Sequence, residues 1–177
     1  VAPVEQNIRK IAIEAKKATF AATGQPGPVY LRFAREKSAL FTAEKTPFQI
    51  GRAEIFWTPK GKAKLAIIAA GPLVHEALLA AAKLEKEGIG VFVVNNHTIK
   101  PMDEKLIIKV AREAGGVVTV EEHQVQGGMG SAVAEVLAKN HPVPMEFIGV
   151  QNHFGESGEP RQLLEAFGLT APHIIKA

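Results

Sequence analysis

The stretch Gly115-Gly-Val-Val-Thr-Val-Glu-Glu-His-Gln-Val-Gln-Gly-Gly-Met-Gly-Ser-Ala-Val-Ala-Glu-Val-Leu137 decides the fold class of this chain. Residues 117–120 form an apolar, β-branched run, which is typical of a strand buried on both faces of a parallel sheet. Three glycines then allow a tight turn and a close approach of the backbone to its neighbours: Gly127, Gly128 and Gly130. The apolar residues after the turn recur at helical spacing: Ala132, Val133, Val136 and Leu137. The stretch therefore predicts a strand, a glycine turn and a helix, which together form one unit of an α/β domain.

The segments on both sides repeat this unit. Apolar runs and helical spacing predict these further elements: strands at residues 65–69, 89–94 and 145–150, and helices at 73–87, 103–114 and 162–167. We expect Gly88 to end the first of these helices. Strands that alternate with helices in this way predict an α/β domain with a mainly parallel sheet and helices on both faces. The order of the strands in that sheet stays open.

The segment before this domain is organised differently. Residues 4–22 have the pattern of an amphipathic helix, residues 24–28 hold helix breakers, and residues 29–33 fit a strand. A strand-helix-strand piece of this size has too few partners to bury both faces of a sheet. Because the chain begins at Val1 and shows no leader, we expect it to be a piece of a longer protein.

Three regions follow from this reading. Residues 1–36 are expected to be the tail of another α/β domain, residues 37–63 an interdomain linker, and residues 64–177 the main domain. The linker holds a short strand within residues 50–57. We expect Phe56 and Trp57 at its end to cover apolar surface, rather than to bind a ligand.

Composition excludes several classes of protein. The 177 residues contain no cysteine, so disulfides and thiolate metal sites are excluded, which fits a cytoplasmic protein. The net charge is +3 and the basic residues are spread along the chain, which does not favour nucleic-acid binding. No apolar run approaches the length of a membrane span, and no signal peptide is visible.

The glycine turn could hold a phosphate, because free N–H groups at a helix N-terminus attract anions. However, its glycines do not follow the dinucleotide-binding spacing, and no Lys-Ser or Lys-Thr pair of a P-loop is present. Close packing of strand against helix is the favoured interpretation. We expect Ser131 to cap the helix after the turn.

Glu121, Glu122 and His123 stand where the central strand leaves the sheet. They could form an acid/base or metal cluster. The other histidines show no ligand spacing, so we expect no metal site: His75, His97, His141, His153 and His173. The carboxyl ends of strands in open α/β sheets carry functional groups, so the three residues are expected to line a cleft or an interface.

Two further polar segments follow strands. The first is His153-Phe-Gly-Glu-Ser-Gly158, which we interpret as a structured loop whose Ser157 starts the next helix. The second holds Arg32 and Arg35, either of which could grip phosphate or carboxylate in a bidentate manner. Taken alone, an arginine at a strand end is more often a surface ion pair.

Several motifs together resemble transketolase. They are Gly27-Pro-Val-Tyr-Leu-Arg-Phe-Ala-Arg35, Ala69-Ala-Gly71, Thr98-Ile-Lys-Pro101, Val118-Thr-Val-Glu-Glu-His123, Gly127-Gly-Met-Gly-Ser131, and Phe154-Gly-Glu-Ser-Gly158 before Phe167-Gly-Leu-Thr170. The resemblance covers essentially the whole chain. It is to the C-terminal portion of the family, preceded by the end of the pyrimidine-binding domain. Deoxyxylulose-phosphate synthases and 2-oxo acid dehydrogenase β subunits share the glycine turn, but they usually lack the Glu-Glu-His and Phe-Gly-Glu-Ser-Gly segments.

The resemblance implies a thiamine-diphosphate enzyme that transfers a two-carbon ketol unit between sugar phosphates. It also implies a homodimer whose active sites lie in domains that are mostly absent here. The family's magnesium ligands and the glutamate that activates the cofactor have no counterpart in this chain, so no catalytic, cofactor-binding or metal-binding residue is expected. Arg35 aligns with the arginine that grips the substrate phosphate, whereas Arg32 is less certain. The chain alone is therefore expected to be inactive, with a structural, dimer-supporting role.

Two rival interpretations remain. One is the C-terminal part of a 2-oxo acid dehydrogenase β subunit, which would act on a 2-oxo acid instead of a ketose phosphate. The other is a non-catalytic module that binds a ligand or a partner through the glycine turn or the Glu-Glu-His corner.

Overall fold

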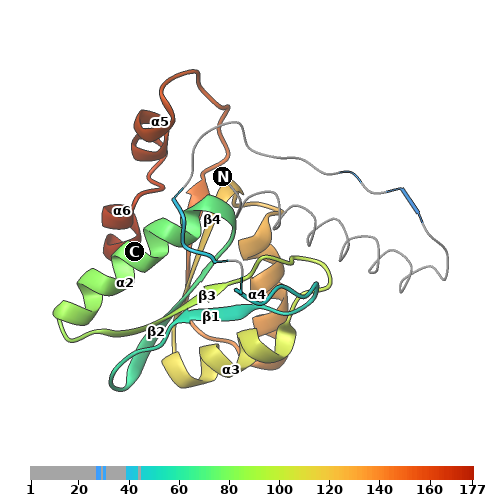
Figure 1. Cartoon of the computed structure of the whole chain (residues 1–177), viewed down its shortest axis with the longest axis vertical. Helices are drawn as coiled ribbons and strands as arrows, with labels where there is room; N and C mark the ends of the chain where they lie inside the picture. The colour runs from blue at the N-terminus through green and yellow to red at the C-terminus, as the bar shows by residue number, and fades with distance from the viewer. Residues whose placement is uncertain (1–26, 29, 31–38, 44) are drawn as a thin grey trace.

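The computed structural model describes residues 27, 28, 30, 39–43 and 45–177 (Figure 1). The strands are β1 (Glu54–Trp57), β2 (Ala63–Ala69), β3 (Gly90–Asn95), β4 (Val117–Gln124) and β5 (Met145–Val150). The helices are α2 (Val74–Lys86), α3 (Glu104–Ala114), α4 (Met129–Asn140), α5 (Pro160–Ala166) and α6 (Ala171–Lys176), and a 3-10 turn covers Gly71–Leu73. Among these elements no helix is long and apolar enough to cross a membrane.

The strands form one sheet in the order β1-β3-β2-β4-β5. The pairs β3–β2, β2–β4 and β4–β5 are parallel, and β1 runs antiparallel to β3. The chain leaves β2 toward β3 on one side, whereas β4 pairs with β2 on the other side. The expected α/β class with a mainly parallel sheet is therefore confirmed.

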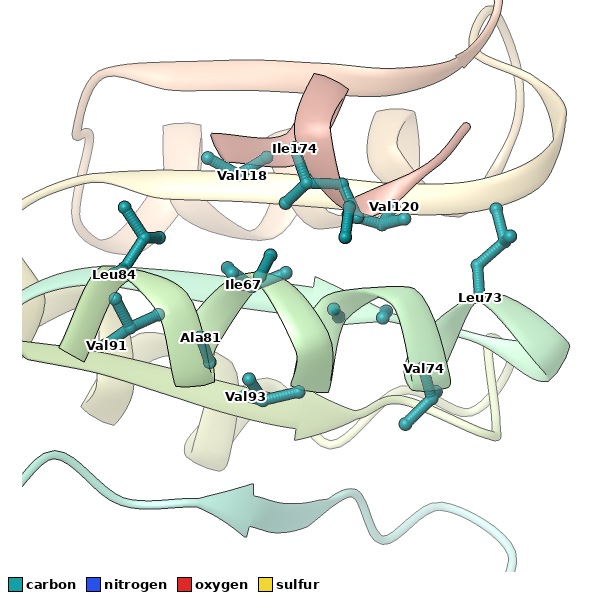
Figure 2. Packing of buried hydrophobic residues seen from close by; sticks show 14 of the residues in the cluster. Ile67, Leu73, Val74, Ala81, Leu84, Val91, Val93, Val118, Val120 and Ile174 are labelled. Carbon is teal, nitrogen blue, oxygen red and sulfur yellow. The ribbon is translucent and has the colours of Figure 1, made fainter. Parts of the chain in front are cut away.

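Helices cover both faces of the sheet. On one face α2 and α6 pack over the strands, and Figure 2 shows Ile67, Val91, Val93, Val118 and Val120 beneath them. On the other face α3 and α4 cover a second cluster that includes these strand residues: Ala66, Ile68, Phe92, Val94 and Val117.

The alternating direction of side chains along each strand explains why both faces of the sheet are buried. Ile67 and Ile68 are neighbours in β2, yet they lie in opposite clusters because successive side chains of a strand point to opposite faces. Both are at most 1% exposed. Each such side chain contributes about 1.5–3 kcal/mol by leaving water, so uninterrupted apolar strands are what this architecture requires.

Most predicted elements are confirmed, and the start of α3 is capped as its sequence suggests. The Asp103 side chain accepts a hydrogen bond from the Leu106 N–H at 3.2 Å. The short strand expected near residue 55 is present as β1, and it belongs to the sheet. Phe56 and Trp57 pack against the apolar cluster under α2, as predicted.

Three details of the prediction are wrong. Helix α4 begins at Met129 after Gly128, so Ser131 is not its N-cap. The Ser131 hydroxyl instead donates to the Val125 carbonyl at 2.8 Å and accepts from the Gly127 N–H at 3.0 Å. Helix α5 begins at Pro160 rather than at Ser157, because Pro is well suited to the first helical position. Helix α6 was not predicted.

The predicted helix and strand before residue 36 lie outside the described residues. The division into 1–36, 37–63 and 64–177 stays a prediction.

Candidate functional site at the carboxyl edge of the sheet

The carboxyl ends of β2, β3, β4 and β5 meet at one edge, because these strands are parallel. Between the ends of β2 and β4 the connections run to opposite sides, which is where open α/β sheets form a ligand crevice. A crevice of about 360 Å³ lies there. It is lined by Ala70, Gly71, Pro72, Ile99, Glu121, Glu122, His123, Gly127, Gly128 and Met129.

Glu121 is buried beneath this crevice, with 4% of its surface exposed. Its carboxylate accepts hydrogen bonds from the Met129 N–H at 2.6 Å and the Gly130 N–H at 2.8 Å. These N–H groups belong to the first turn of α4, where the backbone has no partner of its own and the helix dipole favours negative charge. Glu121 is therefore the cap of α4, supplied from the neighbouring strand.

Glycines surround the Glu121 side chain because nothing larger fits. A Cβ on Gly128 would collide with the Glu121 carboxylate, and a Cβ on Gly130 would lie 2.9 Å from the Phe147 ring. A Cβ on Gly149 would lie 2.8 Å from a Val125 methyl group. Close packing of strand against helix, the favoured interpretation of the glycine turn, is confirmed.

The same geometry excludes the phosphate-binding interpretation of the turn. The N–H groups of Met129 and Gly130 already donate to Glu121, so they are not available to an incoming anion. Among the described residues no group of three or more His, Asp or Glu side chains is arranged to hold a metal ion. The described part of the chain thus does not fit a metal-bound diphosphate.

Glu122 and His123 have a different environment from Glu121, because both are exposed at the crevice. The His123 Nδ1 lies 2.9 Å from the Gln124 carbonyl. Since a carbonyl can only accept, Nδ1 carries a proton, and in the neutral ring Nε2 is an acceptor. The three residues of the predicted cluster are therefore divided: Glu121 is structural, whereas Glu122 and His123 are exposed at the crevice.

The loop after β3 contains buried and half-buried polar residues to which the sequence assigned no role. Burial lowers the pKa of His97, whose ring lies 4.6 Å from the ring of Phe48. Its Nδ1 lies 2.9 Å from the Thr98 hydroxyl. The neighbouring Asn96 is fully buried, and neither polar atom of its side chain has a partner in the described part of the chain. Their position directly after a strand is the only signal that could have identified them.

The loop after β5 is held by the end of β4. The Gln124 amide donates to the His153 carbonyl at 2.9 Å and accepts from the Asn152 N–H at 2.9 Å. The His153 ring stacks on Phe167 with 5.0 Å between ring centres. The next residue, Phe154, is 97% exposed. The predicted structured loop is confirmed, and it displays an aromatic side chain.

Arg32 and Arg35 lie outside the described residues, so the structure does not place the predicted phosphate-binding residue. The role assigned to Arg35 stays a prediction.

The mainly parallel sheet, its crevice and the capped glycine turn define a doubly wound α/β domain. Residues 57–174 match the family model described as Transketolase, C-terminal domain, and the chain belongs to this family.

Known relatives extend well beyond this chain. The 6-deoxy-6-sulfo-D-fructose transketolase subunit SqwH of Clostridium sp. (strain MSTE9) is 44% identical over 151 residues, covering 85% of this chain and 46% of that protein. Transketolase of Rattus norvegicus is 36% identical over 166 residues, covering 93% of this chain and 26% of that protein. A solved structure described as a split gene transketolase, inactive beta4 tetramer, has a TM-score of 0.78 and 42% identity, covering 90% of this chain and 51% of that one. The chain thus spans about half the length of the SqwH subunit and of the split-gene chain, and about a quarter of the rat transketolase.

Proposed function

We propose that this chain is the C-terminal part of a thiamine-diphosphate-dependent transketolase, which moves a two-carbon ketol unit from a ketose phosphate to an aldose phosphate. The observation that carries the proposal is the family match over residues 57–174. It is supported by 44% identity to a transketolase subunit that is itself only about twice as long as the matched region.

The chain's own contribution is structural and substrate-binding. Thiamine diphosphate, with magnesium, supplies the carbon–carbon bond chemistry when it is bound to the rest of the enzyme. No step of that chemistry is assigned to the described residues, because they do not fit the cofactor. Arg35 grips the phosphate group of the sugar through a bidentate, charge-assisted contact. No residue of the chain is assigned a catalytic role.

The chain acts in an assembly. Its partner is the cofactor-binding portion of the enzyme, whether that portion is joined to it or is a separate subunit, as in the split-gene relative. The complete enzyme is a homodimer of such units in the cytoplasm. Alone, the chain is inactive.

Ketol transfer from a ketose phosphate to an aldose phosphate tests the proposal. The reaction is measured with thiamine diphosphate and magnesium, first with the chain alone and then with the chain assembled with its cofactor-binding portion. We expect turnover only in the assembly. Turnover by the chain alone would contradict its inactivity, and use of a 2-oxo acid by the assembly would favour the dehydrogenase interpretation.

A further inference from the structure

The two ends of the sheet differ in what they expose. From residue 54 onward, the described large apolar side chains that are exposed are Leu79 on α2, Ile99 and Phe154, at 46%, 48% and 97%. Ile99 and Phe154 both lie in loops at the carboxyl edge, the first beside the crevice and the second after β5. At the opposite end, the described turns at residues 58–62, 87–89 and 141–144 expose no large apolar side chain. The carboxyl edge is therefore the end of the sheet that presents apolar groups to a partner.

Phe154 is presented by a loop that is already ordered. The Gln124 amide holds the backbone on both sides of His153, and the His153 ring stacks on Phe167. An exposed aromatic on a pre-ordered loop binds a partner at a low cost in conformational entropy. Aromatic residues of this kind are common anchors of protein interfaces.

The segment that precedes β1, residues 48–53, is attached to the same edge. Phe48 lies on the His97 ring at 4.6 Å, and the Ala53 N–H donates to the Asp103 carboxylate at 3.1 Å. A Cβ on Gly51 would lie 3.2 Å from Pro101 Cγ. Strand β1 then begins opposite Asn95, at the carboxyl end of β3. The described chain from Phe48 to Glu54 therefore runs along this edge before it enters the sheet.

The crevice adds an exposed carboxylate to the apolar groups. Within the described part of the chain the Glu122 carboxylate has no hydrogen-bond partner, and it lines the crevice with Ile99 and His123. The buried Glu121 cannot take a donor from outside, because Met129 and Gly130 already donate to it. A partner of this surface should therefore bring an apolar side chain and a basic or N–H donor group.

We propose that the carboxyl-edge surface, formed by Ile99, Glu122, His123 and Phe154, docks on the cofactor-binding portion of the enzyme. Phe154 and Ile99 are the apolar anchors, and Glu122 pairs with a donor of that portion. The proposal rests on the proposed function, since it takes its partner from there.

Hydrogen exchange of the 177-residue chain, alone and inside the complete enzyme, tests the contact. We expect assembly to slow exchange in residues 97–101, 121–128 and 151–158, and to leave residues 58–62 and 141–144 unchanged. Protection of the second set without the first would overturn the proposal.

Variants give a second, independent test. With the cofactor-binding portion supplied as a separate polypeptide, Phe154→Asp and Ile99→Asp should each weaken assembly roughly 10- to 100-fold. Leu79→Asp is the matched control, because Leu79 is as exposed as Ile99 but lies on α2, and it should leave assembly unchanged. Thermal unfolding of each isolated variant separates a binding defect from a folding defect. An equal loss in all three variants, or none in the first two, would overturn the proposal.

Other outcomes are also decisive. If the isolated chain self-associates and Phe154→Asp abolishes that association, the surface binds a second copy and the proposal is wrong. If the assembly forms with a protected carboxyl edge but transfers no ketol unit, the docking stands and the proposed function fails. If ketol transfer occurs while the edge exchanges freely, the docking fails alone.

Discussion

The Arg161 guanidinium donates to the Glu76 carboxylate at 2.6 Å, which joins α5 to a helix 85 residues earlier in the chain. The second oxygen of Glu76 accepts from the Ala171 N–H at 2.7 Å, in the first turn of α6. One buried carboxylate on α2 therefore fixes both C-terminal helices. It acts on α6 as Glu121 acts on α4.

Glu76→Ala is expected to destabilise the chain by about 1–3 kcal/mol, because it removes a helix cap and leaves a buried N–H without a partner. Arg161→Ala should cost less than about 1 kcal/mol, since the Arg161 side chain is 66% exposed and its ion pair is screened by water. Urea unfolding of both variants measures the difference. Equal losses would show that the ion pair, and not the cap, carries the effect.

Glu121 and Glu122 form a matched pair for a second prediction. Glu121→Ala should lower the free energy of unfolding by about 2–3 kcal/mol, because two N–H groups of α4 lose their buried acceptor. Glu122→Ala removes the same charge from an exposed position and should change it by less than about 0.5 kcal/mol. Urea unfolding again provides the measurement. A similar effect of the two substitutions would refute the capping role of Glu121.

Gly130→Ala has two opposing effects on stability: a gain in helix propensity and a loss from overpacking. Gly130 is the second residue of α4, where alanine is favoured over glycine by at most about 1 kcal/mol, the value for a helix interior. The added methyl group would press on the Phe147 ring and the Thr119 hydroxyl, and such overpacking typically costs about 1–3 kcal/mol. We expect a net loss of stability. Gly61→Ala is the control, because nothing lies within 4 Å of its Cβ position. A stabilised Gly130→Ala variant would mean that the helix has room to shift.

The lowered pKa of Glu85 predicts that the free energy of unfolding depends on pH. The hydrogen bond from the Lys60 N–H, followed by that from the Trp57 indole, lowers the pKa of Glu85 from its ordinary value of 4.5. A lowered pKa in the folded state contributes stability above pH 4.5 that is lost as the pH falls through the folded value. Unfolding followed by the fluorescence of Trp57, the single tryptophan, measures this loss. In Glu85→Gln the stability below pH 4.5 should fall less steeply, and an unchanged slope would argue against this carboxylate.

Arg35→Ala tests the proposed phosphate contact in the complete enzyme. Loss of a charge-assisted pair worth about 1.5–3 kcal/mol should raise the KM for a ketose phosphate roughly 10- to 150-fold. The KM for an unphosphorylated ketose should not change. Arg32→Ala serves as the comparison at a neighbouring arginine. An equal rise in KM for both sugars would remove the phosphate-binding role from Arg35.

The fold was largely predictable because its signals are local. The apolar runs of β2 and β4 and the helical spacing after each of them can be recognised within a few residues of one another. The role of Glu121 could not be found in this way, because this residue lies on a strand and caps a helix on the other side of the glycine turn. Glu76 is harder still, because its partners Arg161 and Ala171 are 85 and 95 residues away. Helix α6, Ala171–Lys176, is too short for a periodic pattern.

The Glu121 cap has a consequence for the binding of free anions at the glycine turn. A carboxylate attached to the neighbouring strand is present at the α4 terminus at a high effective concentration, which free anions must exceed to displace it. A free phosphate would therefore compete poorly for the N–H groups of Met129 and Gly130. A glycine turn of the kind that binds phosphate in other α/β folds is here occupied by a carboxylate of the protein itself.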